Sequence, residues 1–482
     1  MSRPGVEIAL LEEPPARTPP TDTGVFFAVG PAQKGSATTP QFIRSMSEFT
    51  TLYGQRVTYS YLWDAIDCYF KEGGSRAYIM RVVGPAPVSA ALMLKDASNA
   101  NCLQVLANSP GAWGNALTVQ ILAGTQGGYF QIQVASAGVI LENSGDLLDK
   151  PAALIWAQSS DYISLVDQAT SVQDPAVVAA TALIGGTDDN TNIVEQNWTN
   201  ALALISRDLG PGQIACPGHT TTAGQTALLA HADANNRVAL VDCVDSGSKA
   251  TLKSAAAALQ GAVPGNRHAA LFAPWAIVPG IVAGTTRIVP WSAIEAGIIS
   301  RNDAHLSPNT AAAGLQNGQS VYAIGLSQAP FSDAYRQDLN ASSVNVVRAL
   351  FNGIMAYGFR TLVNPSGDPN WVAFSNSRLY MAIYADADAI AETYVFGEID
   401  GKGSIFKAMG GELAGMLNSY YNEGSLYGAT PDEAFIVDTG STVNTPDTIA
   451  NLEIHAVLRL RMSPFGELVH IDIVKKLVTE SV

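Results

Sequence analysis

Residues that could carry out catalysis or bind a metal are few in this 482-residue sequence, and they are scattered. No two of its six histidines have the spacing of metal ligands, although histidines far apart in sequence can still meet in a fold. We therefore expect surface or hydrogen-bonded histidines at all six positions: His219, His231, His268, His305, His455 and His470.

The four cysteines show no CxxC spacing. Three of them, Cys102, Cys216 and Cys243, lie in or beside apolar, strand-like runs, and the fourth is Cys68. This pattern predicts buried, reduced thiols.

The commonest sequence signatures of enzymes are missing, since no GxSxG, HExxH, CxxC or Walker A sequence occurs. A dinucleotide-like match at residues 210–215 precedes an apolar strand, so it cannot direct a helix N-terminus at a pyrophosphate. Asp242 and Asp245 follow an apolar strand, where aspartate is catalytic in some α/β enzymes but also caps helices and turns, and we favour capping. We predict no enzyme activity, no cofactor and no metal; an α/β enzyme is the competing interpretation, because fold does not settle function.

Composition restricts the classes of partner. The formal net charge is −15 and no basic run occurs, which argues against binding to nucleic acid or to an anionic membrane surface. Only 14% of the residues are charged, so much of the surface must be neutral, as suits a subunit covered by copies of itself.

Two further observations concern membranes and export. The longest apolar run, residues 269–284, is interrupted by Pro274 and Pro279 before the roughly 20 residues that a bilayer requires, so we expect no membrane insertion. Pro4, Gly5 and Glu7 replace the basic and then apolar stretch of a secretory signal, which predicts a chain that is made and kept in the cytosol.

The elements expected in the first half are an α/β unit and a β module. Residues 1–22 combine a short alternating segment with prolines, which predicts an extended arm. A buried strand at 24–30, a helix from its N-cap Ser47 to Phe70 and a strand at 77–83 follow. Short alternating segments separated by glycine-rich turns then predict a mostly β module up to a turn at residues 185–190.

The second half predicts parallel strands and then a mixed C-terminal region. Apolar runs at 213–216, 237–244 and 268–272 alternate with alanine-rich helices, the pattern of parallel strands with crossover helices. A helix is expected from Gly403 to Asn422, and two alternating segments, 452–461 and 468–478, are expected to be strands.

Several short segments follow one another in a distinctive order. PGVEIALLEE (4–13), TGVFFAVGPAQKG (23–35), SMSEFTTLYG (45–54) and YLWDAIDCYFKEGGSRAYIMRVVG (61–84) come first. Then come SPGAWGNALTVQI (109–121), LIGGTDD (183–189), HAALFAPW (268–275), SRNDAHLSPN (300–309) and NEGSLYGATPDEAFIV (422–437). In this order the sequence resembles the contractile tail sheath family, nearly from end to end.

The resemblance implies a multidomain α/β fold: α/β core domains with a subtilisin-like layer, an inserted β-sandwich domain, and extended N- and C-terminal strand arms. The corresponding divisions are an N-terminal arm (1–22), an N-terminal α/β unit (23–92), the β-sandwich (93–190), the subtilisin-like domain (191–360), a C-terminal sheath domain (361–465) and a C-terminal strand arm (466–482). Most departures from the family pattern lie between residues 300 and 420, where Pro308-Asn309-Thr310 stands in place of Pro-Ala-Asn.

The resemblance also implies a function. The chain would polymerise into a helical or stacked-ring sheath around a tail tube protein, with baseplate and tail terminator proteins as further partners. Contraction would drive the tube through the host envelope for genome ejection. We expect assembly in the host cytoplasm and a final location in the virion, as part of a phage tail. The alternative is the sheath of a headless injection system, of the bacteriocin or secretion type.

Two sets of site residues follow from this interpretation. The terminal arms would exchange between subunits and pair with foreign strands, because their apolar residues alternate and can bury one face. These residues are Val6, Ile8 and Leu10 in the first arm, and Val469, Ile471 and Ile473 in the second. The family's basic attachment helix carries only Lys402 and Lys407 here, at and just before the expected helix 403–422, and the residues expected to contact the tube are Lys402, Lys407 and Glu412.

Overall fold

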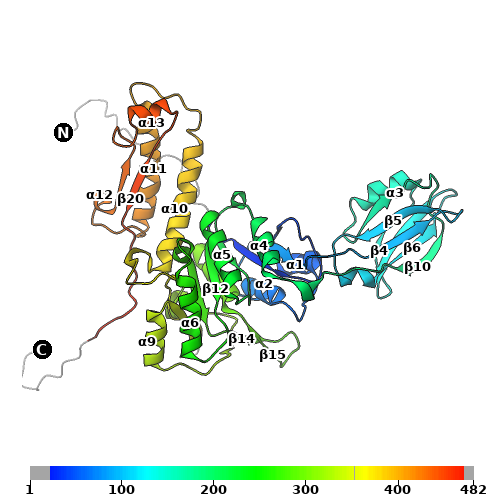
Figure 1. Cartoon of the computed structure of the whole chain (residues 1–482), viewed down its shortest axis with the longest axis horizontal. Helices are drawn as coiled ribbons and strands as arrows, with labels where there is room; N and C mark the ends of the chain where they lie inside the picture. The colour runs from blue at the N-terminus through cyan, green and yellow to red at the C-terminus, as the bar shows by residue number, and fades with distance from the viewer. Residues whose placement is uncertain (1–21, 352, 472–482) are drawn as a thin grey trace, which may run out of the picture.

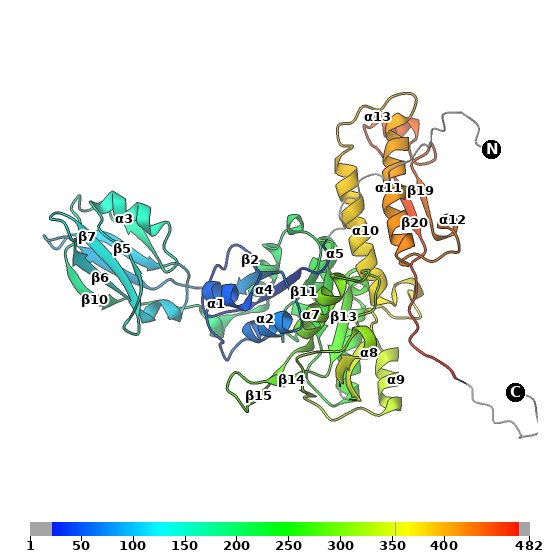
Figure 2. The same ribbon diagram turned by 180° about the vertical axis from the view of Figure 1, so that it is seen from behind.

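The computed structural model describes residues 22–351 and 353–471, and it shows an elongated molecule (Figure 1). A central α/β unit lies between a β-rich unit at one end (residues 88–187, called the β4–β10 unit) and a C-terminal unit at the other (residues 374–462). The view from behind shows the same arrangement (Figure 2). No helix in the described ranges has the length and apolar character needed to cross a bilayer.

An eight-stranded sheet forms the centre, in the order β18-β17-β13-β12-β11-β1-β3-β2. Its six inner strands are parallel, and only the edge strands β2 and β18 run antiparallel. The bounds are β1 (Phe26–Pro31), β2 (Gln41–Ile43), β3 (Ala77–Val82), β11 (Gln213–Ala215), β12 (Val238–Asp242), β13 (Ala269–Ala273), β17 (Val344–Leu350) and β18 (Gly353–Ala356). The parallel strands with crossover helices that the apolar runs predicted are confirmed, because strands covered on both faces are apolar throughout.

Helices cover both faces of this sheet. One face packs on α1 (Met46–Tyr53), α2 (Leu62–Lys71) and α7 (Trp291–Asp303). The other face packs on α4 (Glu195–Ala203), α5 (Thr222–Ala234), α6 (Lys249–Gln260) and α9 (Asp333–Ala341). The smaller helical elements are α8 (Gly314–Asn317), η2 (Asn190–Asn192), η3 (Arg207–Leu209), η4 (Gly265–His268) and η5 (Pro369–Trp371).

The single helix predicted from Ser47 to Phe70 is wrong, because two helices occupy this stretch. The N-cap is Ser45, whose Oγ accepts a hydrogen bond from the Glu48 amide, while the Glu48 carboxylate accepts one from the Arg44 amide. Gly54 ends α1 with φ of 83°, a conformation that favours glycine. Helical spacing was therefore read correctly, but the break between the helices was missed.

Two antiparallel sheets build the β4–β10 unit. One has the order β4-β5-β9 and the other β10-β6-β7-β8, and they share one apolar core. The strands are β4 (Ala91–Lys95), β5 (Asn101–Ala107), β6 (Leu117–Ala123), β7 (Phe130–Ser136), β8 (Val139–Asn143), β9 (Ile163–Asp167) and β10 (Val178–Ala182), with η1 (Ala112–Ala116) and α3 (Lys150–Ala157). The buried guanidinium of Arg81 in β3 ties this unit to the centre by donating to the Ala32 (3.0 Å) and Pro110 (2.7 Å) carbonyls.

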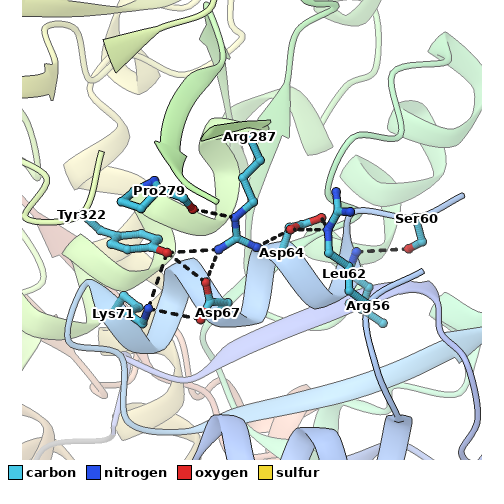
Figure 3. Close-up of polar contacts among 9 residues, drawn as sticks. All are labelled: Arg56, Ser60, Leu62, Asp64, Asp67, Lys71, Pro279, Arg287 and Tyr322. Atoms are coloured by element: carbon cyan, nitrogen blue, oxygen red, sulfur yellow. Dashed lines mark hydrogen bonds and ion pairs between the residues drawn. The ribbon is translucent and has the colours of Figure 1, made fainter. Parts of the chain in front are cut away.

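A hairpin of β14 (Ala276–Pro279) and β15 (Thr286–Val289), joined by β16 (Gly325–Leu326), projects beside α2 (Figure 1). Its strand β15 is held by ion pairs, since the two terminal nitrogens of Arg287 donate to the carboxylates of Asp64 and Asp67 in α2 (Figure 3). Tyr322 donates to Asp67 (3.2 Å), and Arg56 donates to Asp64 (2.8 Å). All three charged side chains at the centre are at most 9% exposed.

The C-terminal unit consists of α10 (Phe374–Glu392), α11 (Ser404–Asn422), the short helices α12 (Pro431–Ala434) and α13 (Pro446–Ala450), and strands β19 (Phe435–Asp438) and β20 (Val457–Leu460). The strand expected over 452–461 is shorter than predicted, because Leu452 lies in a turn with φ of 64° after α13. The described part of the second expected strand, residues 468–471, forms no strand within the chain.

Candidate assembly site

Of the six predicted arm residues, the structure describes two. Val6, Ile8, Leu10 and Ile473 lie outside the described residues. Val469 and Ile471 are described, and each is 78% exposed. Two apolar side chains are thus left in solvent by this chain, as a strand that pairs elsewhere would leave them.

The C-terminal segment is fixed to the central unit just before these residues. Phe465 packs against the core under the central sheet, and the Ser463 amide donates to the Ser425 carbonyl (2.9 Å). The guanidinium of Arg360 binds both carboxylate oxygens of Glu467, with Nε at 2.8 and 3.1 Å. Among the described residues, Glu467 is therefore the last with a charged anchor, and residues 468–471 run away from the body (Figure 1).

Strands β19 and β20 pair only with each other in the described part of the chain. Val437 and Leu458 face the core of the C-terminal unit, while Ile436 points outward and is 53% exposed. A two-stranded sheet has two edges with unused backbone hydrogen-bonding groups, and such a sheet is only marginally stable by itself. It is thus a ready acceptor for further strands.

Helix α11 matches its prediction closely, starting at Ser404 after Gly403 and ending at Asn422. Met409, Leu413, Leu417 and Tyr420 are buried. Ile405 and Met416, on the same side of the helix, are only half-buried. The helix stays continuous through the Gly410-Gly411 pair, since its inner face is held by the packing of the unit.

The three candidate tube-contact residues are exposed: Lys402 precedes the helix, and Lys407 and Glu412 lie on it. At about 100° per residue, Lys407 and Glu412 lie on opposite sides of an exposed row of small residues, which consists of Ser404, Ala408, Gly411 and Gly415. Glu412 also accepts a hydrogen bond from Tyr394; burial first, and then this bond, raise the pKa of the tyrosine. The structure therefore places one cation and one anion beside a smooth helical surface.

The glycines of α11 differ in their surroundings. A Cβ on Gly410 would come within 2.7 Å of Thr439 Oγ1, so this glycine permits a close contact inside the unit. No atom lies within 4 Å of a Cβ built on Gly411 or Gly415. Because glycine in a helix interior costs about 1 kcal/mol relative to alanine, nothing in the described part of the chain explains glycine at these two positions.

The two aspartates that follow β12 accept hydrogen bonds from other parts of the chain. Asp242 accepts hydrogen bonds from the Ser292 amide (2.8 Å) and hydroxyl (2.7 Å) at the start of α7, and burial raises the pKa of this carboxyl to about 6. Asp245 accepts from the hydroxyl of Ser327 (2.6 Å). The preference for capping is confirmed for Asp242, which caps a helix distant in sequence.

The cysteines and histidines follow the same pattern. All four cysteines are buried and free, as predicted, and no two of them form a disulfide. Across residues 22–351 and 353–471, no group of three or more His, Cys, Asp and Glu side chains could hold a metal ion. His219 pairs with Glu195 at 2.9 Å and stacks on Trp198.

No family model and no curated protein matches this sequence. Solved structures do match. The sheath tail protein of Desulfitobacterium hafniense is 14% identical, with a TM-score of 0.61 over 90% of this chain and 93% of that one. The sheath tail protein of Listeria innocua is 13% identical, with a TM-score of 0.63 over 87% and 89%.

The helical sheath of the anti-feeding prophage in its contracted state is 17% identical, with a TM-score of 0.59 over 99% of this chain and 100% of that one. The chain has the fold of contractile tail sheath proteins. At the level of the fold, the resemblance noted in the sequence is therefore confirmed, and the chain is mixed α/β as predicted.

Three features escaped prediction from the sequence. Only the second strand of the β19–β20 hairpin was expected, within residues 452–461, although the apolar run Phe435-Ile436-Val437 was a usable signal for β19. The anchor between Arg360 and Glu467 joins residues 107 positions apart, which no local pattern indicates. The ion pairs of Arg287 with Asp64 and Asp67 likewise join residues far apart in sequence, so no local pattern predicts them.

Proposed function

We propose that this protein is the structural subunit of a contractile tail sheath, which polymerises around an inner tube and contracts to drive the tube through a host envelope. The observation that carries the proposal is the match over 99% of the chain to a sheath seen as a helical assembly in the contracted state. The described surface is consistent with it, because the β19–β20 sheet pairs with no further strand in the described part of the chain, and Val469 and Ile471 are exposed.

The finer architecture belongs to the same proposal. Residues 23–92 and 191–360 would form the α/β core with a subtilisin-like layer, and residues 93–190 an inserted β-sandwich. The parallel central sheet with helices on both faces supports the first assignment. Two antiparallel sheets around one core support the second. Residues 361–465 would be the sheath domain that carries the assembly surfaces, with arms at 1–22 and 466–482.

Assembly would proceed by strand exchange. The alternating arm segments, with Val6, Ile8 and Leu10 at one end and Val469 and Ile471 at the other, would add to the free edges of β19 and β20 of neighbouring subunits. This would complete backbone hydrogen bonds that a single chain leaves open. Glu467, anchored by Arg360, would be the point at which the C-terminal arm departs.

The tube contact would lie on the exposed row of α11. Gly411 and Gly415 allow a partner backbone to approach closely, and Lys407 and Glu412 add one exposed charge on each side. Exposed ion pairs contribute about 0–1 kcal/mol each, so the sheath could release the tube during contraction. Tail tube, baseplate and tail terminator proteins are the partners that this role requires.

The test is assembly of the purified chain, followed by negative-stain microscopy. The full chain is expected to form hollow, sheath-like polymers, and variants lacking residues 1–20 or 468–482 are expected to stay monomeric with unchanged circular dichroism. Long normal polymers from either deletion would overturn strand exchange. Absence of any ordered polymer from the full chain, with or without tube protein, would overturn the sheath role.

Phage tail and headless injection system remain the two candidate settings. The phage tail, with genome ejection and a place in the virion, is the first candidate. The anti-feeding prophage sheath matches over nearly the whole of both chains, which favours the second. Mass spectrometry of particles purified with this chain distinguishes them: capsid proteins and packaged DNA indicate a phage, and their absence with an intact tube and baseplate indicates an injection apparatus.

A further inference from the structure

A row of aromatic side chains lies along α10 and remains open to solvent. Trp371, Tyr380 and Tyr384 follow one another with ring centroids 5.4 and 6.1 Å apart, and His268 lies 5.6 Å from Tyr380. Tyr380 and Tyr384 are 37% and 36% exposed. Aromatic faces gathered in this way form an apolar surface of the kind that marks a docking site.

The rings are held in place from both ends. The guanidinium of Arg207 lies 4.7 Å from the centre of Tyr384 and pairs with Asp388, while that of Arg267 lies 5.8 Å from Trp371 and pairs with Asp368. Each guanidinium is therefore fixed by a carboxylate and fixes a ring in turn. The row is thus ordered before any partner binds, which lowers the entropic cost of docking.

The chemistry of such a row suits proline. Proline-rich segments adopt the extended polyproline II conformation without hydrogen bonds of their own, and they dock on aromatic surfaces because little entropy is lost. The chain contains one such segment, with prolines in two pairs at Pro14-Pro15 and Pro19-Pro20. At about 3.1 Å per residue, Pro15 and Pro19 would be about 12 Å apart, close to the length of the ring row.

The position of this segment in the chain also fits. Pro20 is two residues from Asp22, where the described chain begins. The next residue, Thr23, donates to Asp303 (2.7 Å), and Arg378 of α10 binds the same carboxylate (2.6 Å). Just before β12, Asn236 also donates to the Met381 carbonyl of α10 (2.9 Å). The described chain therefore begins close to Arg378, near the start of α10.

We propose that residues 14–20 of this chain dock on the row of Trp371, Tyr380 and Tyr384. Docking orients the N-terminal arm along α10, which leads from the central unit to the C-terminal unit (Figure 2). The alternating residues 6–10 would then depart from a fixed point on the subunit. This docking requires no polymer, so it stands or falls separately from the sheath role.

The test is site-specific photo-crosslinking in the full chain. With p-benzoylphenylalanine in place of Tyr384, digestion and mass spectrometry of the dilute monomer are expected to find crosslinks to peptides of the same copy that contain residues 14–20. A matched control carries the same group in place of Tyr427, which is 62% exposed and lies outside the row. It is expected to give no such product.

A second variant separates docking from chance proximity. Replacing all four prolines by alanine leaves the described fold untouched and is expected to lower the crosslink yield at position 384 at least fivefold. An unchanged yield in that variant, or crosslinks at position 384 only to other segments or to another protein, would overturn the proposal.

Discussion

The central sheet and the C-terminal unit differ in how completely the chain itself buries their apolar side chains and pairs their polar groups. In the central unit, strands such as β1 and β13 are fully buried, and even the charged groups of Arg287, Asp64 and Asp67 are paired within the chain. In the C-terminal unit, a sheet of two strands keeps free edges, and α11 carries two glycines next to empty space. Among the described residues, the central unit thus buries and pairs its inner groups, whereas the C-terminal unit leaves more of its backbone and helix surface open.

This difference suggests a division of labour. A complete unit keeps its shape when forces act on it, whereas an incomplete unit gains free energy when another subunit supplies the missing strands. Mutations in the two regions should therefore separate two measurements. Changes in the central unit should lower the free energy of unfolding of the isolated chain, and changes in the C-terminal unit should alter assembly with little effect on unfolding.

The largest effect on unfolding is expected from Arg287→Ala. This change leaves Asp64 and Asp67 buried with one cation fewer, and breaking a buried pair from one side costs about 3–5 kcal/mol. Urea denaturation measures the loss. Lys71→Ala is the control, because its side chain is 52% exposed and lies 3.6 Å from Asp67, so less than about 1 kcal/mol is expected. Equal losses from both variants would contradict the view that buried ion pairs hold β15 on α2.

A smaller effect, with a defined pH dependence, is expected at Glu295. Burial raises the pKa of this carboxyl to about 8 in the folded chain, so the folded state binds a proton more tightly than the unfolded state. Stability from this group is present at low pH and is lost as the pH rises from about 4.5 to about 8. Glu295→Gln should remove this loss and stabilise the chain at pH 8 by at least about 1.4 kcal/mol, the equivalent of one pKa unit.

Thermal unfolding of both proteins at pH 5 and pH 8 checks the prediction. A pH dependence that is the same in the variant and the parent would show that Glu295 ionises normally in the folded chain.

In α11, Gly411→Ala should stabilise the isolated chain by about 1 kcal/mol, because alanine favours the helix and its Cβ meets no atom within 4 Å. The same methyl group should weaken co-sedimentation with purified tube protein if the row of small residues is the tube contact. Gly410→Ala is the matched control and should destabilise the chain, since its Cβ would approach Thr439 to 2.7 Å. Gly411→Ala with full tube binding would remove this face from the contact.

The smallest effect on unfolding, and the largest on assembly, is expected from Ile436→Asp. Ile436 is 53% exposed, so its replacement should change the free energy of unfolding by no more than about 0.5 kcal/mol. A charge on the outer face of β19 should nevertheless block polymer growth seen by light scattering. Val139→Asp, at a 63% exposed position in β8, should polymerise normally. Polymerisation of both variants would place the subunit contacts elsewhere.

Several elements were predictable because their cause is local. The apolar runs at β11, β12 and β13 indicated parallel strands, and the spacing of Met409, Leu413 and Leu417 indicated α11 almost to the residue. Where a boundary depended on one capping bond, as at Ser45 instead of Ser47, the same reasoning failed. Alternation alone also overestimated the strand around Leu452, where a left-handed turn interrupts it.

The amino-acid sequence by itself determined the class of fold, the buried thiols and the order of short segments that resembles the sheath family, since these depend on hydrophobic periodicity and on residue types at fixed spacing. Only the tertiary structure decided which groups meet across long separations. Arg287 reaches Asp64 over 223 positions, and Arg378 pairs with Asp303 over 75. It also decided that a side chain at Gly410 would collide with Thr439, whereas one at Gly411 would have free space. Neighbouring residues on a helix face different directions, and what they meet there is supplied by other parts of the chain.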